Sequence, residues 1–220
     1  MKKKVLNILS LLTNGLIVYL ILSAFWVFLT GDGVGNMRVS GWMAFRYFTV
    51  DSNALAALAA LIMVFYNLKA LKTGENRAPH SLHVFRLIGT AGVTLTFLTV
   101  ILYLGNASSF KLMLSGKNFY MHLLGPFLAF LAFTVFEAPC CRITWKETLY
   151  PFVPVLLYAG LYYYMVIHLG PKNGGWPDFY FFNTNGNWLK TFVIIVPCAY
   201  LVCAGLMALR NFFNRKFSGD

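Results

Sequence analysis

Residues 45–68 read FRYFTVDSNALAALAALIMVFYNL, and this stretch decides the fold. Its uniformly apolar part, residues 54–68, covers only ~22 Å at 1.5 Å per residue, which is shorter than the ~30 Å of bilayer hydrocarbon. A membrane-spanning helix must therefore extend back to about Phe45. That extension draws four polar residues to membrane depth, namely Thr49, Asp51, Ser52 and Asn53. Polar side chains are costly there and often mark a site.

Five further apolar runs of similar length occur in the 220-residue chain, of which 59% is hydrophobic and 11% charged. A soluble domain of this size needs far more charge to cover its surface. The sequence therefore predicts an all-α, polytopic integral membrane protein, a six-helix bundle forming one domain over residues 1–220. The expected transmembrane helices are residues 5–29, 45–68, 85–104, 119–136, 149–168 and 188–209.

The distribution of basic residues predicts the orientation. With a cytoplasmic N-terminus, 12 of the 18 Lys and Arg residues fall inside. The other six fall outside, namely Arg38, Arg46, Lys111, Lys117, Lys172 and Lys190. This asymmetry follows the positive-inside rule and predicts a multi-pass protein of the plasma (inner) membrane with both termini cytoplasmic. The net charge of +11 then reflects topology and contact with membrane lipids, and no nucleic acid partner is expected.

Ionisable residues gather at the outer ends of the predicted helices. His122 lies in the first turn of the fourth helix, which runs inward like the second helix that carries Thr49. His168 ends the fifth helix on the outside, and Asp178 follows in the next loop. The topology thus predicts that these side chains converge on the extracytoplasmic side of the bundle.

Helical spacing sorts the polar residues of the second span by face. Arg46, Thr49 and Asn53 fall on one face at spacings of three and four, whereas Asp51 points to another side. A Thr hydroxyl becomes a nucleophile when a base such as His removes its proton. Asn53, Ser52 or Arg46 are candidate donors to the resulting oxyanion.

A structural role for the same residues stays open beside this hypothesis. Thr hydroxyls in membrane helices often bond the carbonyl one turn back, and a His at a helix end often serves as a cap. The functional hypothesis also requires a cavity. We expect one among the second, fourth and fifth helices, polar near Thr49 and His122 and apolar deeper.

Several motifs recur in a fixed order: Phe45-Arg-Tyr-Phe-Thr49-Val-Asp51-Ser-Asn53, Met121-His122-Leu-Leu-Gly-Pro126, Tyr150-Pro151, His168, and Trp176-Pro177-Asp178-Phe179. This order resembles the androgen-induced family of six-helix membrane proteins and its bacterial relatives. The resemblance implies an intramembrane threonine hydrolase of fatty acid esters of hydroxy fatty acids. It assigns Thr49, followed by Asp51, as the nucleophile and His122, followed by Pro126, as the base. Tyr120 and Leu124-Gly125 replace an Asn and a second His found in the animal motif.

The expected function is therefore hydrolysis of a lipid or fatty acyl ester that enters from the bilayer, catalysed by Thr49 and His122. Supporting or substrate-binding roles are expected for Arg46, Asp51, Ser52, Asn53, His168 and Asp178. No metal or organic cofactor is implied. The alternative is a proton-linked transporter or a lipid-binding sensor without hydrolytic activity, because intramembrane His and Asp residues also serve proton relays.

The remaining ionisable residues are expected to be structural. His80 and His83 are interpreted as solvated residues of the loop between the second and third helices. Glu137 and Glu147 lie at cytoplasmic helix ends and are expected to be solvated as well.

Small and aromatic residues are also assigned structural roles. Gly89 and Gly92 are expected to permit close helix packing. Tyr162, Tyr163 and Tyr164 are expected in the aromatic belt at the membrane interface.

Overall fold

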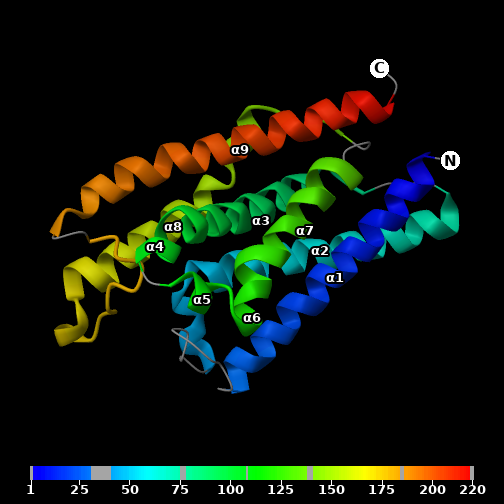
Figure 1. Ribbon diagram of the computed structural model, residues 1–220. Coiled ribbons are helices and arrows are strands. Elements are labelled where there is room, and N and C mark those ends of the chain that lie inside the picture. The colour runs from blue at the N-terminus through cyan, green and yellow to red at the C-terminus, as the bar shows by residue number, and fades with distance from the viewer. Residues whose placement is uncertain are drawn as a thin grey trace.

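The computed structural model describes residues 2–30, 41–74, 78–107, 109–137, 141–183 and 186–218, and these residues form helices and no strand. Within them, six helices are long and apolar enough to cross a membrane, as predicted: Lys3–Thr30, Phe48–Thr73, His80–Ala107, Gly116–Phe136, Lys146–Leu169 and Trp188–Phe217. The first and last helices bring their free ends to the same end of the bundle (Figure 1). Arg38 and Arg77, which contribute to the charge asymmetry, lie outside the described residues.

In chain order the elements are α1 (Lys2–Thr30), η1 (Gly41–Arg46), α2 (Phe48–Thr73), α3 (His80–Thr99), η2 (Val100–Leu104), α4 (Gly105–Ala107), α5 (Phe110–Met113), α6 (Gly116–Phe119), η3 (Tyr120–Leu124), α7 (Gly125–Leu131), η4 (Ala132–Phe136), η5 (Lys146–Leu149), α8 (Phe152–Tyr162), η6 (Tyr163–Leu169), η7 (Pro171–Asn173) and α9 (Trp188–Ser218). The turns η2, η3, η4 and η6 are π-helical and continue the neighbouring α-helices. The third, fourth and fifth spans are therefore each built from several elements.

Five of the six spans begin at other residues than the hydropathy pattern predicts, and two of these differences affect candidate residues. The second span was expected from Phe45, but Tyr47 is extended, with φ −99° and ψ 124°, and separates the 3₁₀ turn η1 from α2. Thr49 therefore lies in the first turn of α2. The third helix begins at His80, directly after Pro79, and not at residue 85. The histidines His80 and His83 consequently belong to α3, and the prediction that they lie in a loop is wrong.

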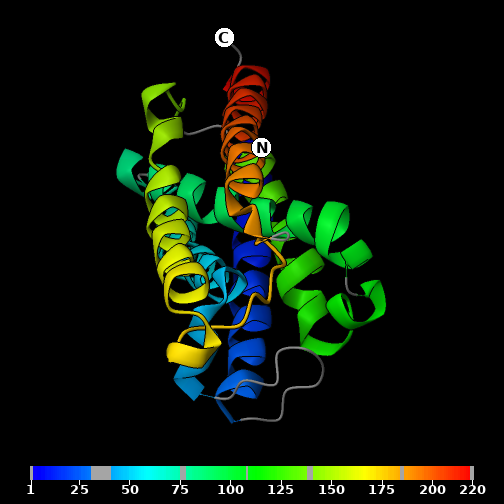
Figure 2. The ribbon, with the colours of Figure 1, turned by 90° about the vertical axis from the view of Figure 1, so that its left-hand side faces the viewer.

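The centre of the bundle is formed by close packing of α2 on α3. A Cβ atom placed on Gly89 would lie 2.8 Å from the Cα atom of Ala56, and one on Gly92 would lie 3.0 Å from the Cβ atom of Ser52. Larger residues would force the two helices apart, so the predicted packing role of both glycines is confirmed. In contrast, α8 and α9 lie on the flank of this core and expose most of their apolar side chains (Figures 1 and 2).

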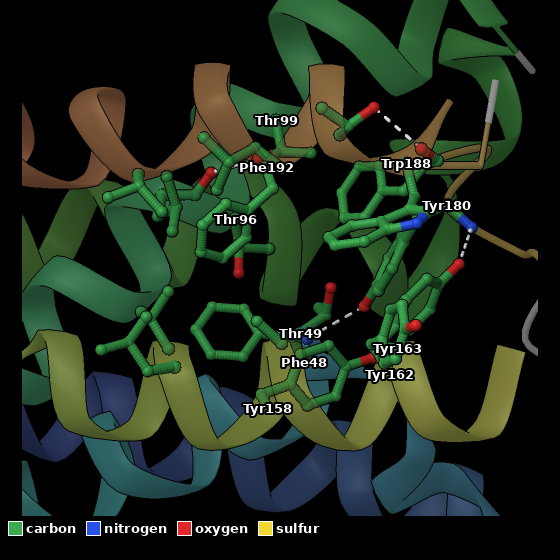
Figure 3. Close-up of a pocket in the computed structure, with 18 of the residues that line it drawn as sticks. Phe48, Thr49, Thr96, Thr99, Tyr158, Tyr162, Tyr163, Tyr180, Trp188 and Phe192 are labelled. Carbon is green, nitrogen blue, oxygen red and sulfur yellow. Dashed lines mark hydrogen bonds between the residues drawn. The ribbon is translucent and has the colours of Figure 1, made fainter. Parts of the chain in front are cut away.

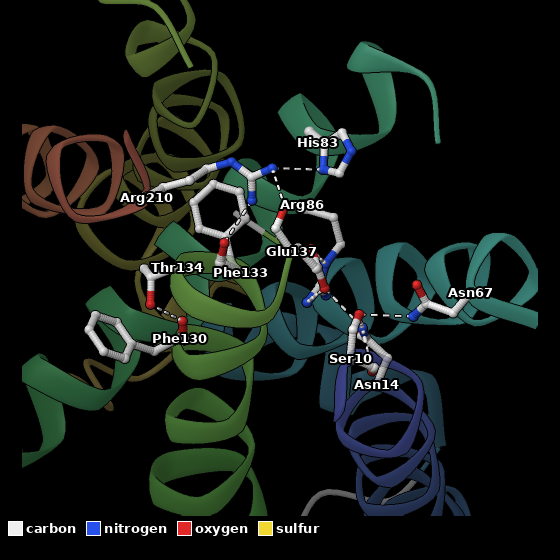
Figure 4. Close-up of polar contacts among 10 residues, drawn as sticks. All are labelled: Ser10, Asn14, Asn67, His83, Arg86, Phe130, Phe133, Thr134, Glu137 and Arg210. Carbon is white, nitrogen blue, oxygen red and sulfur yellow. Dashed lines mark hydrogen bonds and ion pairs between the residues drawn. The ribbon is translucent and has the colours of Figure 1, made fainter. Parts of the chain in front are cut away.

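A buried polar network joins the helices near the end of the bundle that holds the chain termini. The Arg86 guanidinium of α3 donates to Glu137 through Nε at 3.1 Å and Nη2 at 2.9 Å. Asn14 of α1 donates to the same carboxylate at 2.8 Å, and Arg210 of α9 donates to the Glu137 carbonyl at 3.0 Å. The network thus fastens α1, α3 and α9 to the end of the fourth span (Figure 4).

This network corrects two further predictions. Glu137 and His83 are buried, and His83 lies 3.0 Å from an Arg210 nitrogen, so neither is a solvated residue. Burial alone raises the pKa of Glu137, but the charge and hydrogen bonds of Arg86, with those of Asn14, outweigh it and hold the pKa below its usual range. Glu137 is therefore a buried carboxylate that depends on its partners.

Removal of one partner of the Arg86–Glu137 pair should destabilise the protein strongly. Arg86→Met leaves a buried, unpaired carboxylate and is expected to cost about 3–5 kcal/mol, whereas Arg86→Met combined with Glu137→Met should recover much of that loss. Unfolding in SDS-containing mixed micelles, followed by circular dichroism, measures both. The exposed Arg142→Met serves as the control, and an Arg86→Met protein as stable as this control would contradict a stabilising role for the pair.

The orientation can be tested by cysteine labelling. In a Cys-free background, Lys172→Cys should react with a membrane-impermeant maleimide from outside, and Thr73→Cys only after the membrane is opened. Both positions are exposed, so access is limited by the bilayer alone. The reverse labelling pattern would place the chain termini outside and overturn the predicted topology.

Candidate functional site

Thr49 is buried, with 3% of its surface exposed, at the start of the long helix α2. The amides of Val50 and Asp51 both donate to the Tyr47 carbonyl, at 2.9 and 3.2 Å. The Thr49 amide instead makes a long contact, 3.5 Å, with the phenol oxygen of Tyr180. A helix N-terminus carries partial positive charge, so negative charge that develops at the Thr49 side chain is stabilised there.

Pro126 determines the local geometry around His122. Proline has no N–H and its ring clashes with the carbonyl four residues earlier, so the helix widens to the π turn η3 and the Gly125 amide donates to Tyr120. A side chain at Gly125 would prevent this turn, because its Cβ would lie 2.6 Å from the Tyr120 carbonyl oxygen. In an α-helix the Met121 carbonyl would accept from the Gly125 amide, but that amide donates to Tyr120. In a π-helix it would accept from residue 126, which is a proline and has no N–H. The Met121 carbonyl therefore has no partner in its own helix.

Asn53 of α2 satisfies that orphaned carbonyl. Its amide nitrogen donates to Met121 at 3.1 Å and to the Thr49 carbonyl at 2.8 Å. One side chain thus ties the turn that carries Thr49 to the residue that precedes His122. The predicted convergence of these two segments is explained by the pairing of Asn53 with the chain distorted by Pro126.

His122 is fully buried and is held through one ring nitrogen. Its Nδ1 lies 2.7 Å from the Met113 carbonyl oxygen, which can only accept a hydrogen bond, so Nδ1 carries a proton. In the neutral imidazole, Nε2 then presents a lone pair. This is the tautomer that a general base requires.

The structure brings Thr49 and His122 into adjoining segments but does not join them directly. No hydrogen bond links the two side chains among the residues that the structure describes. Neither does the Thr49 hydroxyl bond a backbone carbonyl there, as the purely structural alternative requires. The catalytic roles of both residues stay predictions.

A cavity lies at Thr49. Its volume is about 120 Å³, below the ~300–1,000 Å³ typical of small-molecule sites. Its walls come from α2, α3, α8 and α9 and from the loop that carries Tyr180, and are mostly apolar. Residues of the fourth span, His122 included, are not among those that line it. The expected cavity among the second, fourth and fifth helices is therefore found in part, with α3 and α9 in place of the fourth helix.

Thr49 lies at the polar side of this cavity, between Phe48 and Tyr180 (Figure 3). Away from Thr49, the cavity reaches the surface between α8 and α9. Leu156 of α8 and Phe192 of α9 both line it and are exposed on the outside of the bundle. Since these flanks are the apolar faces of membrane-spanning helices, the opening faces the hydrocarbon region.

The other residues predicted around Thr49 in α2 and η1 point in different directions. Ser52 donates to the Thr49 carbonyl at 3.2 Å and lies 3.2 Å from the Thr96 hydroxyl. The Arg46 guanidinium lies over the Tyr47 and Phe179 rings, at 5.0 and 5.5 Å from their centroids.

Asp51 lines a second cavity of about 270 Å³, which also contacts α3 and α8. Thr49 lines the first cavity, so the side chains of Asp51 and Thr49 line different cavities. Asp51 and His122 are not hydrogen bonded to each other in the described part of the chain.

The residues predicted after the fifth helix behave differently from each other. His168 is exposed and stacks on Tyr164, with ring centroids 5.4 Å apart, and is remote from the hydrogen bonds around Thr49. Asp178 accepts a hydrogen bond from the Tyr162 hydroxyl at 2.6 Å, and others from the Phe182 and Asn183 amides, each at 2.9 Å. Asp178 therefore shapes the loop that carries Tyr180 and does not itself face the cavity.

Sequence reasoning missed the phenols of the site. Tyr158 and Tyr180 line the cavity beside Thr49, and the Tyr158 hydroxyl donates to the Arg46 carbonyl at 2.7 Å. Tyr162, expected in the interfacial belt, is buried beneath the loop, whereas Tyr163 is exposed. Tyr158 and Tyr162 are one turn apart on the fifth helix, and this spacing could have indicated that both phenols face the interior of the bundle.

Comparisons with known proteins identify no relative. No family model, no curated protein and no solved structure matches the chain. The function must therefore be argued from the cavity and the groups around Thr49.

Proposed function

We propose that the protein is an intramembrane hydrolase of lipid acyl esters, with Thr49 as the nucleophile and His122 as the general base. One observation carries this proposal: a buried threonine side chain lies at the wall of an apolar cavity that opens towards the hydrocarbon region. The apolar walls of the cavity suit an acyl chain, and the hydroxyl is the group that can react with its carbonyl carbon.

The proposed reaction has two stages. His122 removes the Thr49 proton as the hydroxyl oxygen attacks the ester carbonyl, and then returns that proton to the departing alcohol. Water next attacks the acyl-threonine and gives a proton to His122. His122 passes this proton to the Thr49 oxygen as its bond to the acyl group breaks, which releases the fatty acid and restores both residues. The hydrogen bond of His122 to Met113 supports this role, because it leaves Nε2 able to accept a proton.

The position of the site supports a substrate supplied by the outer leaflet. Thr49 lies in the first turn of α2, so it lies near one membrane surface and not at the midplane. The charge asymmetry of the sequence assigns that surface to the extracytoplasmic side. A lipid would place its ester near the headgroup region at Thr49 and extend its chain between α8 and α9.

Substitution of the two proposed catalytic residues should abolish ester hydrolysis. Thr49→Ala removes the nucleophile, and His122→Ala should lower kcat by about 10²–10⁴-fold through loss of the base. The two losses should not add, because the residues act as a unit. Thr49→Ser should keep part of the activity, since the hydroxyl survives. The assay is hydrolysis of a fluorogenic long-chain ester by purified protein in detergent.

Matched controls separate chemistry from folding. Thr73→Ala makes the same substitution at the exposed far end of α2, and His80→Ala removes an exposed histidine of α3. Both should retain parental activity. A folded Thr49→Ala protein as active as the parent would exclude Thr49 as the nucleophile.

Covalent labelling distinguishes hydrolysis from the alternative functions. An alkyl fluorophosphonate should add once to the parent, at Thr49, and not to Thr49→Ala, as read by intact mass and peptide mapping. A parent without activity on acyl esters and without an adduct would instead favour a lipid-binding sensor or transporter, for which the same cavity would hold an unreacted ligand.

A further inference from the structure

We propose that Tyr180 is a catalytic residue of this site, whose phenol donates a hydrogen bond to the oxyanion formed when Thr49 attacks an acyl ester. This inference rests on the proposed function and adds a group from a distant loop, 131 residues further along the chain.

The Tyr180 phenol lies directly at the nucleophile. Its oxygen is 3.5 Å from the Thr49 amide nitrogen, and it also interacts with the Thr49 side chain. Tyr180 is buried and lines the same cavity as Thr49, where Figure 3 shows the two residues side by side. A carbonyl carbon in reach of the Thr49 hydroxyl therefore has its oxygen within reach of this phenol.

The hydrogen bonds around Thr49 leave the Tyr180 proton available. The Thr49 amide is a donor, so the Tyr180 oxygen accepts in that contact. The neighbouring Tyr158 phenol commits its own proton to the Arg46 carbonyl at 2.7 Å. Of these three groups, only the Tyr180 phenol has a proton that these hydrogen bonds do not use and that can point to a new acceptor at Thr49. Burial also raises the pKa of Tyr180 to about 12, so the phenol is protonated at neutral pH.

The loop around Tyr180 holds the ring in place. The Tyr180 amide donates to the Tyr162 hydroxyl at 3.3 Å, and Tyr162 in turn donates to Asp178. The next residue, Phe181, has a φ of 56°, a left-handed conformation that is uncommon for a residue other than glycine. The Tyr103 hydroxyl fastens this turn by donating to the Phe181 carbonyl at 2.7 Å. Backbone strain of this kind clusters at functional sites.

The step balances without any further reactant. As the Thr49 oxygen bonds to the carbonyl carbon, the carbonyl π electrons move to its oxygen, and the Tyr180 O–H donates to that oxyanion. The proton stays on Tyr180 throughout, while the Thr49 proton goes to the base. When the tetrahedral intermediate collapses, the carbonyl re-forms, the alcohol leaves with the proton held by the base, and the hydrogen bond from the phenol to the oxygen weakens.

Tyr180→Phe tests the assignment, with Tyr200→Phe as the control. Both lose one phenol, but Tyr200 is an exposed residue of α9 that stacks on Trp145 and does not line the cavity. Tyr180→Phe should lower kcat by about 10²–10³-fold with KM changed less than about threefold, as for loss of one oxyanion donor. Tyr200→Phe should keep kcat within about threefold of the parent.

The pH profile supplies a readout that a structural role would not move. Replacing Tyr180 by a ring-fluorinated tyrosine keeps its size but lowers the phenol pKa. Since only the protonated phenol donates, activity should fall as the pH rises through that pKa. The fluorinated protein should therefore lose activity at a lower alkaline pH than the parent.

The outcomes separate the two proposals. An active parent with unchanged kcat in Tyr180→Phe, or an unchanged alkaline limb in the fluorinated protein, overturns the role of Tyr180 and leaves Thr49 hydrolysis intact. If Tyr180→Phe does not fold, the fluorinated protein alone decides. A parent inactive on acyl esters removes the proposed function and this inference together.

Discussion

The hydrogen bonds of Asn53 are the interaction on which the rest of the site depends. In hydrocarbon, a backbone carbonyl without a partner is costly, and only groups within the protein can satisfy it. Pro126 leaves the Met121 carbonyl without a donor in its own helix. The Asn53 side-chain amide donates to this carbonyl and also to the Thr49 carbonyl. The π turn at His122 therefore needs the Asn53 side chain of α2 as a donor, and Asn53 needs the carbonyl that this turn exposes as an acceptor. This coupling fixes the position of Thr49 relative to the His122 segment before any ligand is present.

The two ends of the bundle use polar residues differently. At the end with the chain termini, Arg86 and Glu137 neutralise each other within a dense set of hydrogen bonds. At the other end, neutral groups predominate: Thr49, Asn53 and Tyr180 meet beside an apolar cavity. A buried ion pair resists rearrangement because either partner alone is penalised. Neutral hydroxyls exchange partners at lower cost, which suits the proposed ester hydrolysis, in which a carbonyl enters and leaves the site.

Much of the fold could be predicted because bilayer thickness constrains helix length. The shortness of residues 54–68 correctly placed Thr49 within the second membrane span, and the glycines at 89 and 92 correctly indicated close packing. The burial of Glu137 could not be predicted, since an acid at a helix end has the same local sequence whether it faces headgroups or an arginine. The contact of Tyr180 with Thr49 could not be predicted either, because it depends on the path of a loop and loops have no helical periodicity. The π turn at His122 was readable in principle from Pro126.

The opening between α8 and α9 has a consequence for how the cavity is filled. A ligand that enters from hydrocarbon competes with the lipids of the bilayer, not with water. Occupancy is then set by the mole fraction of the ligand in the membrane plane, so added inert lipid dilutes it even when its amount per volume of buffer is constant. The surrounding membrane acts as the solvent of the site, and a change in lipid composition becomes a change in effective concentration.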